Sequence, residues 1–330
     1  MLVLNPFTHD TRVLKEARSL ASASFDVTVW ALKTETVPVH EDMYGFRVKR
    51  VKQESLSLPL RPPGLVYLET IVKATVHLVR EDADVYHAHD AKALPACYLA
   101  SRLRNVPLIY DAHEFLLEAG GTNRRSRLRS QLWRFFEGLW IPRTQAVITV
   151  NVSIAEELAR LHGVEPTVLM NSQEYVDLPK SNILREELSI ADEEYIILYA
   201  GILAHGRGLE QLVASAQDLA DDAVIVLMGH DRLDGKLQQL THEMDVGDRV
   251  RFRAAVPPEQ VPRYVAGADI GVMPTQAVKP SYVYGSGNKL FHYIMAGIPS
   301  AVSDQPEKRR IVETYDVGAV FDETDPRSIA

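Results

Sequence analysis

Hydrophobic residues along this chain form short apolar runs that alternate with segments of helical periodicity. Runs such as Asp26–Ala31, Pro107–Asp111 and Ala146–Val150 have the length and composition of buried strands. The segments between them, such as Thr11–Ala23, repeat apolar residues every three or four positions, as amphipathic helices do. Strands that alternate with helices in this way predict right-handed βαβ units on a parallel sheet with both faces covered.

The alternation is interrupted once, near the middle of the chain. Residues 173–190 show neither period and bring Pro179 together with several polar residues, which predicts a linker. Residues 1–172 and 191–330 on either side each repeat the strand–helix pattern. We therefore expect an α/β fold with two Rossmann-like, doubly wound domains. Because such sheets bind ligands at the carboxyl ends of their strands, we expect the two domains to face one another across a cleft.

Composition limits the functions to consider. The chain has 330 residues, of which 46% are hydrophobic and 24% charged, as in globular proteins. Its formal net charge of −8 argues against broad binding of nucleic acid. Cys97 is the single cysteine, which excludes an internal disulfide and fits a reducing compartment. We find no signal peptide and no apolar run near the ~20 residues of a membrane span, so we expect a cytoplasmic protein.

A glycine-rich turn followed by a predicted helix lies in the last quarter of the chain. Gly285 and Gly287 flank Ser286, and Asn288 is placed to cap the helix that follows. Backbone N–H groups at a helix start, together with the helix dipole, attract anions. Lys289 adds a cation in the first turn, where it is unfavourable for the helix itself and so indicates a negatively charged ligand. The alternative is an ordinary junction between a loop and a helix.

A second glycine-rich turn, Gly201–Gly208, follows another predicted strand of the same domain. It carries Arg207, whose planar fork of donors suits phosphate. Two such turns in one domain can hold a diphosphate from two sides. Together they favour a diphosphate site more strongly than either turn alone.

Polar residues also follow the first predicted strand of the N-terminal domain. Asp10 opens a predicted helix, where it either caps that helix or contacts a substrate. Arg12 is expected at the surface or between the domains. Residues 5–12 lack the glycine fingerprint of dinucleotide-binding enzymes, which disfavours a redox function.

Three histidines lie at the ends of predicted strands. His87 and His89 alternate on one strand and so point to one face of the sheet, as a pair of metal ligands can. The neighbouring sequence offers no third ligand of matching character, so we do not favour a metal. His113 follows the next strand, and its ordinary pKa near 6.5 suits acid–base work at a substrate. The alternative is a structural histidine.

Residues 124–143 combine six arginines with Trp133, Phe135, Phe136 and Trp140. A basic, aromatic amphipathic helix can lie on an anionic membrane surface. Equally, the aromatic side chains can pack against the N-terminal sheet while the arginines remain solvated. The sequence leaves both arrangements open.

The order and spacing of five sequence blocks resemble GT-B glycosyltransferases of the large retaining family 4, the glycosyl transferases group 1. The resemblance covers nearly the whole chain, and the set of blocks is far more specific than any one of them. The blocks are D-T-R-V-L-K-E-A-R-S-L at Asp10–Leu20, V-Y-H-A-H-D at Val85–Asp90, Y-D-A-H-E at Tyr110–Glu114, Y-A-G-I-L-A-H-G-R-G-L-E at Tyr199–Glu210 and N-K-L-F-H-Y-I-M-A-G-I-P at Asn288–Pro299.

The resemblance implies a UDP- or GDP-linked sugar donor held mainly by the second domain, with no bound metal and no other cofactor. Arg207 matches the basic residue that contacts the donor diphosphate, and His113 matches the histidine at the reaction centre. We place Asp10 and Glu114 on the acceptor side. The expected donor-binding residues are Gly201, Arg207, Tyr284, Gly285, Ser286, Gly287, Asn288, Lys289 and His292.

Three features depart from the family pattern. Tyr284 and His292 stand where the family has paired glutamates, the first near the donor sugar and the second on the nucleotide ribose. A histidine can still hydrogen-bond a ribose hydroxyl, whereas a tyrosine lacks the carboxylate charge. Ile202 stands where many members have an arginine, which leaves Arg207 as the main cation of that turn. Members also end in a helix that crosses back onto the first domain, and this chain reaches Ala330 without one.

We therefore expect a retaining glycosyltransferase that moves a sugar from a nucleotide sugar to a hydroxyl of a sugar or lipid-linked acceptor. Synthesis of a cell-surface polysaccharide or glycolipid is the expected pathway, in the cytoplasm or peripherally on the inner face of the membrane through residues 124–143. Two alternatives stay open. One is a sugar-nucleotide epimerase on the same fold, and the other is a catalytically degenerate subunit that binds sugar nucleotides.

Overall fold

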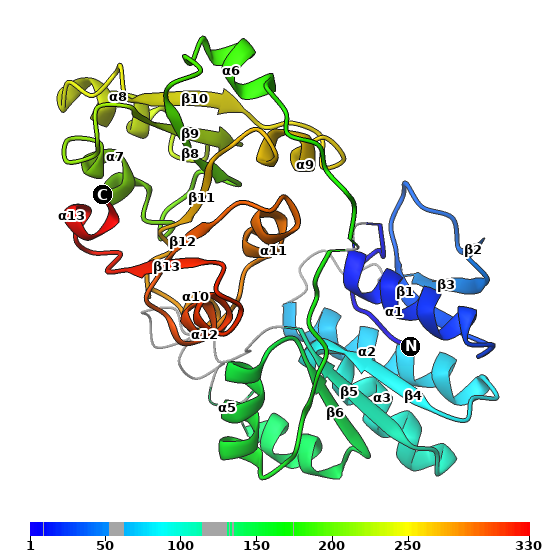
Figure 1. Cartoon of the computed structure of the whole chain (residues 1–330). Helices are drawn as coiled ribbons and strands as arrows, with labels where there is room; N and C mark the ends of the chain where they lie inside the picture. The colour runs from blue at the N-terminus through cyan, green and yellow to red at the C-terminus, as the bar shows by residue number, and fades with distance from the viewer. Residues whose placement is uncertain (9, 53–62, 114–130, 132, 134, 174) are drawn as a thin grey trace. The chain divides into compact units, whose positions relative to one another are not determined.

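The chain divides into two compact units, Met1–Met170 and Asn171–Ala330, in the computed structural model (Figure 1). The structure describes residues 1–330 with the exception of residues 9, 53–62, 114–130, 132, 134 and 174. Each unit is built around a sheet that is parallel apart from one edge strand of the first.

The sheet of the first unit is assembled on both sides of the chain's first residues. Leu2 forms parallel bridges to Trp30 of β1 on one side and to Ala88 of β4 on the other. Strands β3 and β2 extend the sheet beyond β1, with β2 antiparallel, and β5, β6 and β7 extend it beyond β4. The elements are α1 (Thr11–Ser22), β1 (Thr28–Lys33), β2 (His40–Met43), β3 (Phe46–Lys52), α2 (Pro63–Arg80), β4 (Tyr86–His89), α3 (Asp90–Arg104), β5 (Leu108–Ala112), η2 (Ile141–Arg143), β6 (Ala146–Thr149), α5 (Val152–His162) and β7 (Thr167–Val168).

The chain leaves this central segment toward β1 and later returns on its other side at β4. The strand order therefore reverses there, and parallel sheets bind ligands outside the carboxyl ends of strands at such a point. The start of α1 lies with the carboxyl ends of β4 and β5, at the same end of the strands (Figure 1).

The second unit has a six-stranded parallel sheet in the order β10, β9, β8, β11, β12, β13. Alternate residues of its central strands face opposite cores: Leu198 and Val226 pack on one side, and Tyr199 and Leu227 on the other. The order reverses between β8 and β11. The elements are α6 (Ile183–Leu188), β8 (Tyr195–Ala200), α7 (Leu209–Ser215), β9 (Ala223–Gly229), α8 (Lys236–Glu243), β10 (Val250–Ala254), α9 (Val261–Val265), β11 (Ile270–Met273), α10 (Pro280–Tyr284), α11 (Asn288–Met295), β12 (Ser300–Ser303), α12 (Pro306–Tyr315), β13 (Gly318–Phe321) and α13 (Pro326–Ile329).

The α/β class with two parallel sheets is confirmed, and several details differ from the sequence-based expectation. Part of the expected linker, 173–190, forms α6, whose Leu184 is fully buried in the core of the second unit. The edge strands β2 and β13 were not predicted because they are short and carry polar or small residues. The last residues form the short helix α13, which packs on α7, where we expected no helix.

Candidate functional site

The loop after β8 places a glycine and an arginine at the carboxyl edge of the second sheet. A Cβ atom at Gly201 would lie 2.2 Å from Cε of Lys289, so only glycine leaves room for that lysine side chain. Arg207, later in the same loop, lays its guanidinium over the ring of Tyr282, 4.4 Å from the ring centre. The charge of Arg207 also acts on Lys289. The cations of the two predicted glycine-rich turns therefore belong to one site.

Tyr293 fixes α11 against the sheet. Its hydroxyl donates to the carbonyl of Leu198 over 3.1 Å and accepts from the N–H of Ala200 over 3.3 Å. Its ring lies against Gly271 of β11, where a Cβ atom would approach the ring to within 2.2 Å. The helix is consequently held against β8 and β11, between which the strand order reverses.

The turn before α11 leaves backbone N–H groups for a ligand. Gly287 is the N-cap residue, with a φ of +73° that strains any L side chain. Asn288, expected to cap the helix, is instead its first residue, since Gly287 occupies the cap position. Within the described part of the chain, no acceptor meets the N–H groups of Asn288 and Lys289. These N–H groups and the helix dipole favour an anion at this position.

The basic side chains of Arg207 and Lys289 have no anionic partner among the described residues. The ammonium of Lys289 lies 4.7 Å from the centre of the Tyr199 ring. Burial, together with the charges of Arg207 and Lys308, lowers the pKa of Lys289 to about 7. A bound anion would supply the counter-charge that this arrangement lacks.

Lys308 is a member of this site that the sequence analysis missed. Its side chain is 2% exposed, and Nζ donates to the carbonyls of Tyr282 and Gly285 over 2.7 and 3.0 Å and to Oε1 of Gln305 over 2.6 Å. Burial lowers its pKa to about 8, and the nearby carboxylate of Glu323 opposes that effect. Lys308 therefore holds the end of α10 and the start of the glycine turn. From the sequence P-E-K-R-R alone, this lysine would be expected on the solvated face of a helix.

The remaining predicted donor-binding residues lie along the same stretch. Tyr284 is the last residue of α10, Gly285 caps its C-terminus, and Ser286 follows in the turn. His292 lies one turn along α11 from Asn288. Contact between these residues and a donor stays a prediction.

A buried ion pair joins α1 to β5 in the first unit. Nε and Nη2 of Arg12 donate to the two carboxylate oxygens of Asp111 over 3.0 and 2.8 Å, and Nη1 donates to the carbonyl of Leu169 over 2.7 Å. Arg12 is 5% exposed and Asp111 is fully buried. The expectation that Arg12 lies at the surface or between the domains is wrong, because the carboxylate that pairs with it lies 99 residues further along the chain.

Asp111 also contacts two histidines. Nε2 of His113 lies 2.9 Å from Oδ2 of Asp111, and Nδ1 of His89 lies 3.3 Å from the same oxygen. The other ring nitrogen of His113 is 3.6 Å from Oδ2 of Asp90. Burial would raise the pKa of Asp111, but hydrogen bonds from His113, His89 and Arg12 bring it below its ordinary value. Burial would lower the pKa of His113, but the hydrogen bond to Asp111 and the charges of Asp90 and Asp111 raise it.

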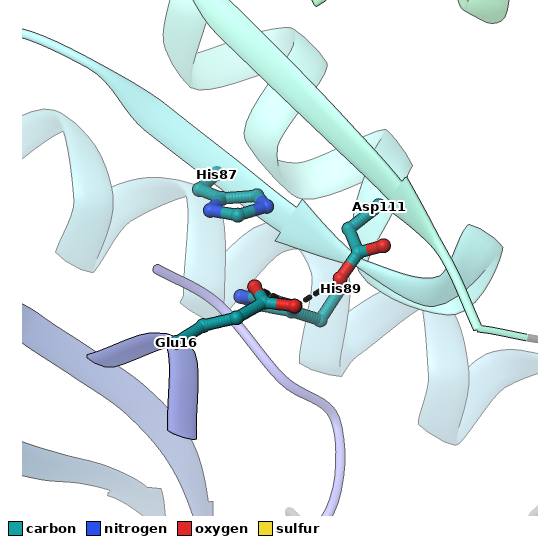
Figure 2. A group of neighbouring side chains, drawn as sticks. All are labelled: Glu16, His87, His89 and Asp111. Carbon is teal, nitrogen blue, oxygen red and sulfur yellow. Dashed lines mark ion pairs between the residues drawn. The ribbon is translucent and has the colours of Figure 1, made fainter. Parts of the chain in front are cut away.

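Glu16 and His87 complete a buried cluster with His89 and Asp111 (Figure 2). One oxygen or nitrogen from each of the four side chains lies within 4.8 Å of the others. Both carboxylate oxygens of Glu16 and the Nε2 atoms of His87 and His89 are buried without a hydrogen-bond partner among the described residues. Burial and the charge of Asp111 raise the pKa of Glu16 to about 8, whereas burial lowers that of His89 to about 4. The fold thus adds two carboxylates to the histidine pair for which the sequence offered no third ligand.

The acceptor-side predictions are only partly described. Asp10 caps α1: its Oδ1 accepts from the N–H of Val13 over 3.1 Å, and its Oδ2 accepts from Nδ2 of Asn5 over 2.8 Å. The capping role is therefore present, and contact with an acceptor stays a prediction. Glu114 lies outside the described residues.

The basic and aromatic segment 124–143 is also only partly described, because residues 124–130, 132 and 134 lie outside the described residues. Trp133 packs edge-on against Tyr67, with ring centres 5.7 Å apart, whereas Phe135 is 66% exposed. The ring contact of Trp133 is thus with α2, and contact of the segment with a membrane stays a prediction. None of the described helices is both long and apolar enough to span a membrane.

Two units, each built on a largely parallel sheet, define the class of fold, which is that of GT-B glycosyltransferases. HepE from Anabaena, solved in complex with UDP, superposes with a TM-score of 0.74 at 16% identity, covering 99% of this chain and 86% of that one. WaaG, a glycosyltransferase involved in lipopolysaccharide biosynthesis, superposes with a TM-score of 0.67 at 15% identity, covering 99% and 88%. At these identities the likeness shows the fold alone.

The sequence itself shows the family. Residues 9–171 match the profile described as the glycosyl transferase 4-like domain, and residues 180–330 match that of the glycosyl transferases group 1. The chain belongs to glycosyltransferase family 4. A D-inositol 3-phosphate glycosyltransferase from Xylanimonas cellulosilytica is 24% identical over 285 residues, which are 80% of this chain and 68% of that relative. The chain covers 63% and 64% of the length of two other curated relatives. The activity of such whole enzymes is therefore ascribed to this chain only as a proposal.

Proposed function

We propose that this protein transfers a sugar, with retention of anomeric configuration, from a nucleoside-diphosphate sugar to a hydroxyl of a sugar or lipid-linked acceptor. The site around Arg207 and Lys289 binds the donor diphosphate. His113 in the first unit acts at the reaction centre. The observation that carries the proposal is the pair of basic side chains without an anionic partner in the described structure, next to free N–H groups of α11.

A diphosphate fits this arrangement in charge and in geometry. The N–H groups of Asn288 and Lys289 and the ammonium of Lys289 together offer donors at the start of one helix. The guanidinium of Arg207, fixed over the Tyr282 ring, supplies a second cation. As the bond between sugar and diphosphate breaks, negative charge builds on the leaving diphosphate, and fixed donors and cations stabilise it. The UDP bound by HepE supports a uridine nucleotide as the first donor to try.

The donor site is tested by calorimetric titration with UDP-glucose and GDP-mannose, each with and without chelator. We expect one of them to bind, and Arg207→Ala and Lys289→Met each to weaken binding at least about tenfold. Arg309→Ala is the matched control, because Arg309 lies in the same unit but is paired with Asp304 and Glu313. Unchanged affinity in both site variants would show that the diphosphate lies elsewhere.

His113 is tested by separating binding from turnover. We expect His113→Ala to lower kcat at least about a hundredfold while the donor still binds, since the residue lies in the other unit. Loss of donor binding with unchanged turnover at saturating donor would contradict a place at the reaction centre. Proton NMR of the product sugar during the first turnovers reports whether its anomeric configuration is retained.

A second candidate is a subunit that binds nucleotide sugars without transferring them. It is favoured by Tyr284 and His292, which stand where the family resemblance leads us to expect glutamates. It predicts nucleotide-sugar binding without sugar transfer to any acceptor and without hydrolysis. Tyr284→Glu and His292→Glu, alone and together, distinguish the two candidates, because restored carboxylates would raise transfer only in a degenerate site.

The acceptor is proposed to belong to a cell-surface polysaccharide or glycolipid. The involvement of WaaG in lipopolysaccharide biosynthesis and the exposed Phe135 of the basic segment 124–143 support this choice. Co-sedimentation with vesicles that contain a phosphatidylglycerol fraction tests the membrane contact. We expect binding that falls with added salt and with Phe135→Ser, and no retention on neutral vesicles. Equal retention of wild type and variant, or none on either vesicle, would remove this part of the proposal.

A further inference from the structure

The buried cluster of the first unit has the composition of a metal site that neither the family nor the donor chemistry requires. We propose that Glu16, His87, His89 and Asp111 bind a divalent transition-metal ion such as Zn²⁺ (Figure 2). The proposal does not rest on the nucleotide-sugar site, whose residues lie in the second unit.

The distances approach those of a four-coordinate site. Metal–ligand bonds of about 2.0–2.1 Å place tetrahedral ligand atoms roughly 3.3–3.5 Å apart. Nδ1 of His89 lies 3.3 Å from Oδ2 of Asp111 and 3.9 Å from Oε2 of Glu16. A nitrogen of His87 completes a set in which every pair lies within 4.8 Å. Side-chain adjustments on the order of 1 Å are enough to bring the four ligand atoms onto one ion.

The second observation is the set of polar atoms left without partners. His87 is 8% exposed and has a buried Nε2 without a hydrogen bond among the described residues. The same holds for both carboxylate oxygens of Glu16. Native proteins rarely leave several such atoms together, so each group of them calls for an explanation. Oε1 of Glu16 does form an ion pair with Nε of Arg12 at 3.1 Å, so the ion would serve chiefly Oε2 of Glu16 and a nitrogen of His87.

Two of the four side chains are carboxylates, which attract a cation. As ligands, Glu16 and Asp111 would each carry a negative charge, and Arg12 supplies one positive charge beside them. Arg12 contacts both ligand carboxylates, at 3.1 Å from Oε1 of Glu16 and 2.8 Å from Oδ1 of Asp111. It can keep those contacts while Oε2 and Oδ2 turn to the metal, as outer groups that orient ligating carboxylates do.

The donor set indicates the kind of ion. Two imidazoles with two carboxylates suit Zn²⁺ and neighbouring transition metals, whereas Mg²⁺ and Ca²⁺ prefer all-oxygen sites. Asp111 would link the ion to His113, which lies 2.9 Å from its Oδ2. Occupancy of the site therefore bears on the histidine that we place at the reaction centre.

The test uses the full chain after dialysis against chelator. ZnCl₂ is titrated by calorimetry, and CoCl₂ by visible absorption, because four-coordinate Co²⁺ absorbs much more strongly than the six-coordinate ion. Glu16→Gln and His87→Asn remove one ligand each. His40→Asn is the matched control, because His40 is an exposed histidine of the same unit, on β2.

We expect one equivalent of either ion, intense Co²⁺ bands, and an affinity lowered at least about tenfold by each ligand variant but not by the control. Absence of binding would show that the cluster is satisfied by water and protons and would overturn the proposal. Binding unchanged in both ligand variants would place the ion elsewhere and overturn it too. If thermal melting shows that His87→Asn does not fold, the affinity of Glu16→Gln and the Co²⁺ spectrum of wild type decide whether the ion binds to the cluster. Titration with UDP-glucose in the same samples reports separately on the donor site.

Discussion

Replacing Lys289 by methionine is the sharpest test of how the second unit recognises its ligand. The ammonium lies against Gly201 and over the Tyr199 ring, with no anionic partner among the described residues. Methionine keeps much of the apolar length of the side chain and removes the charge. The substitution therefore separates packing from electrostatics at one position.

The magnitude follows from the depressed pKa. A pKa of about 7 instead of 10.5 means that the protein opposes the charged form by at most ~5 kcal/mol, at ~1.4 kcal/mol for each tenfold change in proton affinity. Partial exposure of the side chain makes the effective value smaller. A charge-assisted contact with a diphosphate is worth about 2–3 kcal/mol, so its loss in Lys289→Met weakens binding roughly 30- to 150-fold.

The pH dependence of binding gives the assay its specificity. Above pH 7 the free protein holds Lys289 mostly neutral, and binding of the diphosphate must protonate it. The affinity of wild type for UDP-glucose therefore falls as pH rises above about 7, by roughly five- to sevenfold per pH unit at its steepest, and levels off below about pH 6. UDP-glucose is preferred to UDP because its phosphates are diesters, whose charge stays constant over this range. Lys289→Met should show no such slope.

Calorimetry in buffers of different ionisation enthalpy measures the proton uptake directly. We expect roughly 0.7–0.85 of a proton to be taken up at pH 8 by wild type and none by Lys289→Met. An affinity within twofold of wild type, or an unchanged pH slope in the variant, would refute the assignment of Lys289 to the diphosphate.

Stability changes in the opposite sense. The folded-state pKa of Lys289 lies below that of the unfolded chain, so the unfolded state binds more protons between about pH 7 and 10.5. The contribution of Lys289 to the free energy of unfolding thus rises with pH across that window, and it is least favourable below pH 7. Lys289→Met should lack this rise and should be at least as stable as wild type at pH 6, as measured by urea unfolding.

Three further substitutions test how the sites are built, each by urea or thermal unfolding. Lys308→Met removes a buried donor to three acceptors and should cost about 2–4 kcal/mol; a change below about 0.5 kcal/mol would contradict its positioning role. Gly271→Ala forces a methyl group into a buried ring and should cost about 1–3 kcal/mol and weaken nucleotide binding, whereas Gly247→Ala, with open space around it, should do neither. Arg12→Met leaves a buried carboxylate unpaired and should cost about 3–5 kcal/mol, against at most about 1 kcal/mol for Arg47→Ala at an exposed pair; equal effects would argue that Arg12 is not buried with its carboxylate.

Local patterns in the sequence were enough for the fold class and singled out the stretches that we propose to bind the donor. Alternating apolar runs and amphipathic segments predicted the strands and helices. A strand buried on both faces is a short apolar run, and a helix that covers a sheet has an apolar residue every three to four positions. Glycine-rich turns after strands predicted where ligands approach, because backbone N–H groups are exposed there. These signals singled out Gly201, Arg207 and Lys289, which the structure places near one another.

Long-range packing decided what the sequence left out. Lys308 was missed because nothing in its own segment tells that its ammonium turns inward to backbone carbonyls of a turn more than 20 residues earlier. Arg12 was expected to lie at the surface because its carboxylate partner, Asp111, arrives with a strand 99 residues away.

The histidine cluster shows the division most clearly. The sequence placed His87 and His89 on one face of one strand, since side chains alternate along a strand. It could not bring Glu16 from α1 and Asp111 from β5 to the same place, because that depends on the point at which the strand order of the sheet reverses. Hydrophobic periodicity is a local property of the sequence, so it could be read directly from the sequence. The meeting of charged groups from separate elements is set by topology and burial, and only the tertiary structure decided it.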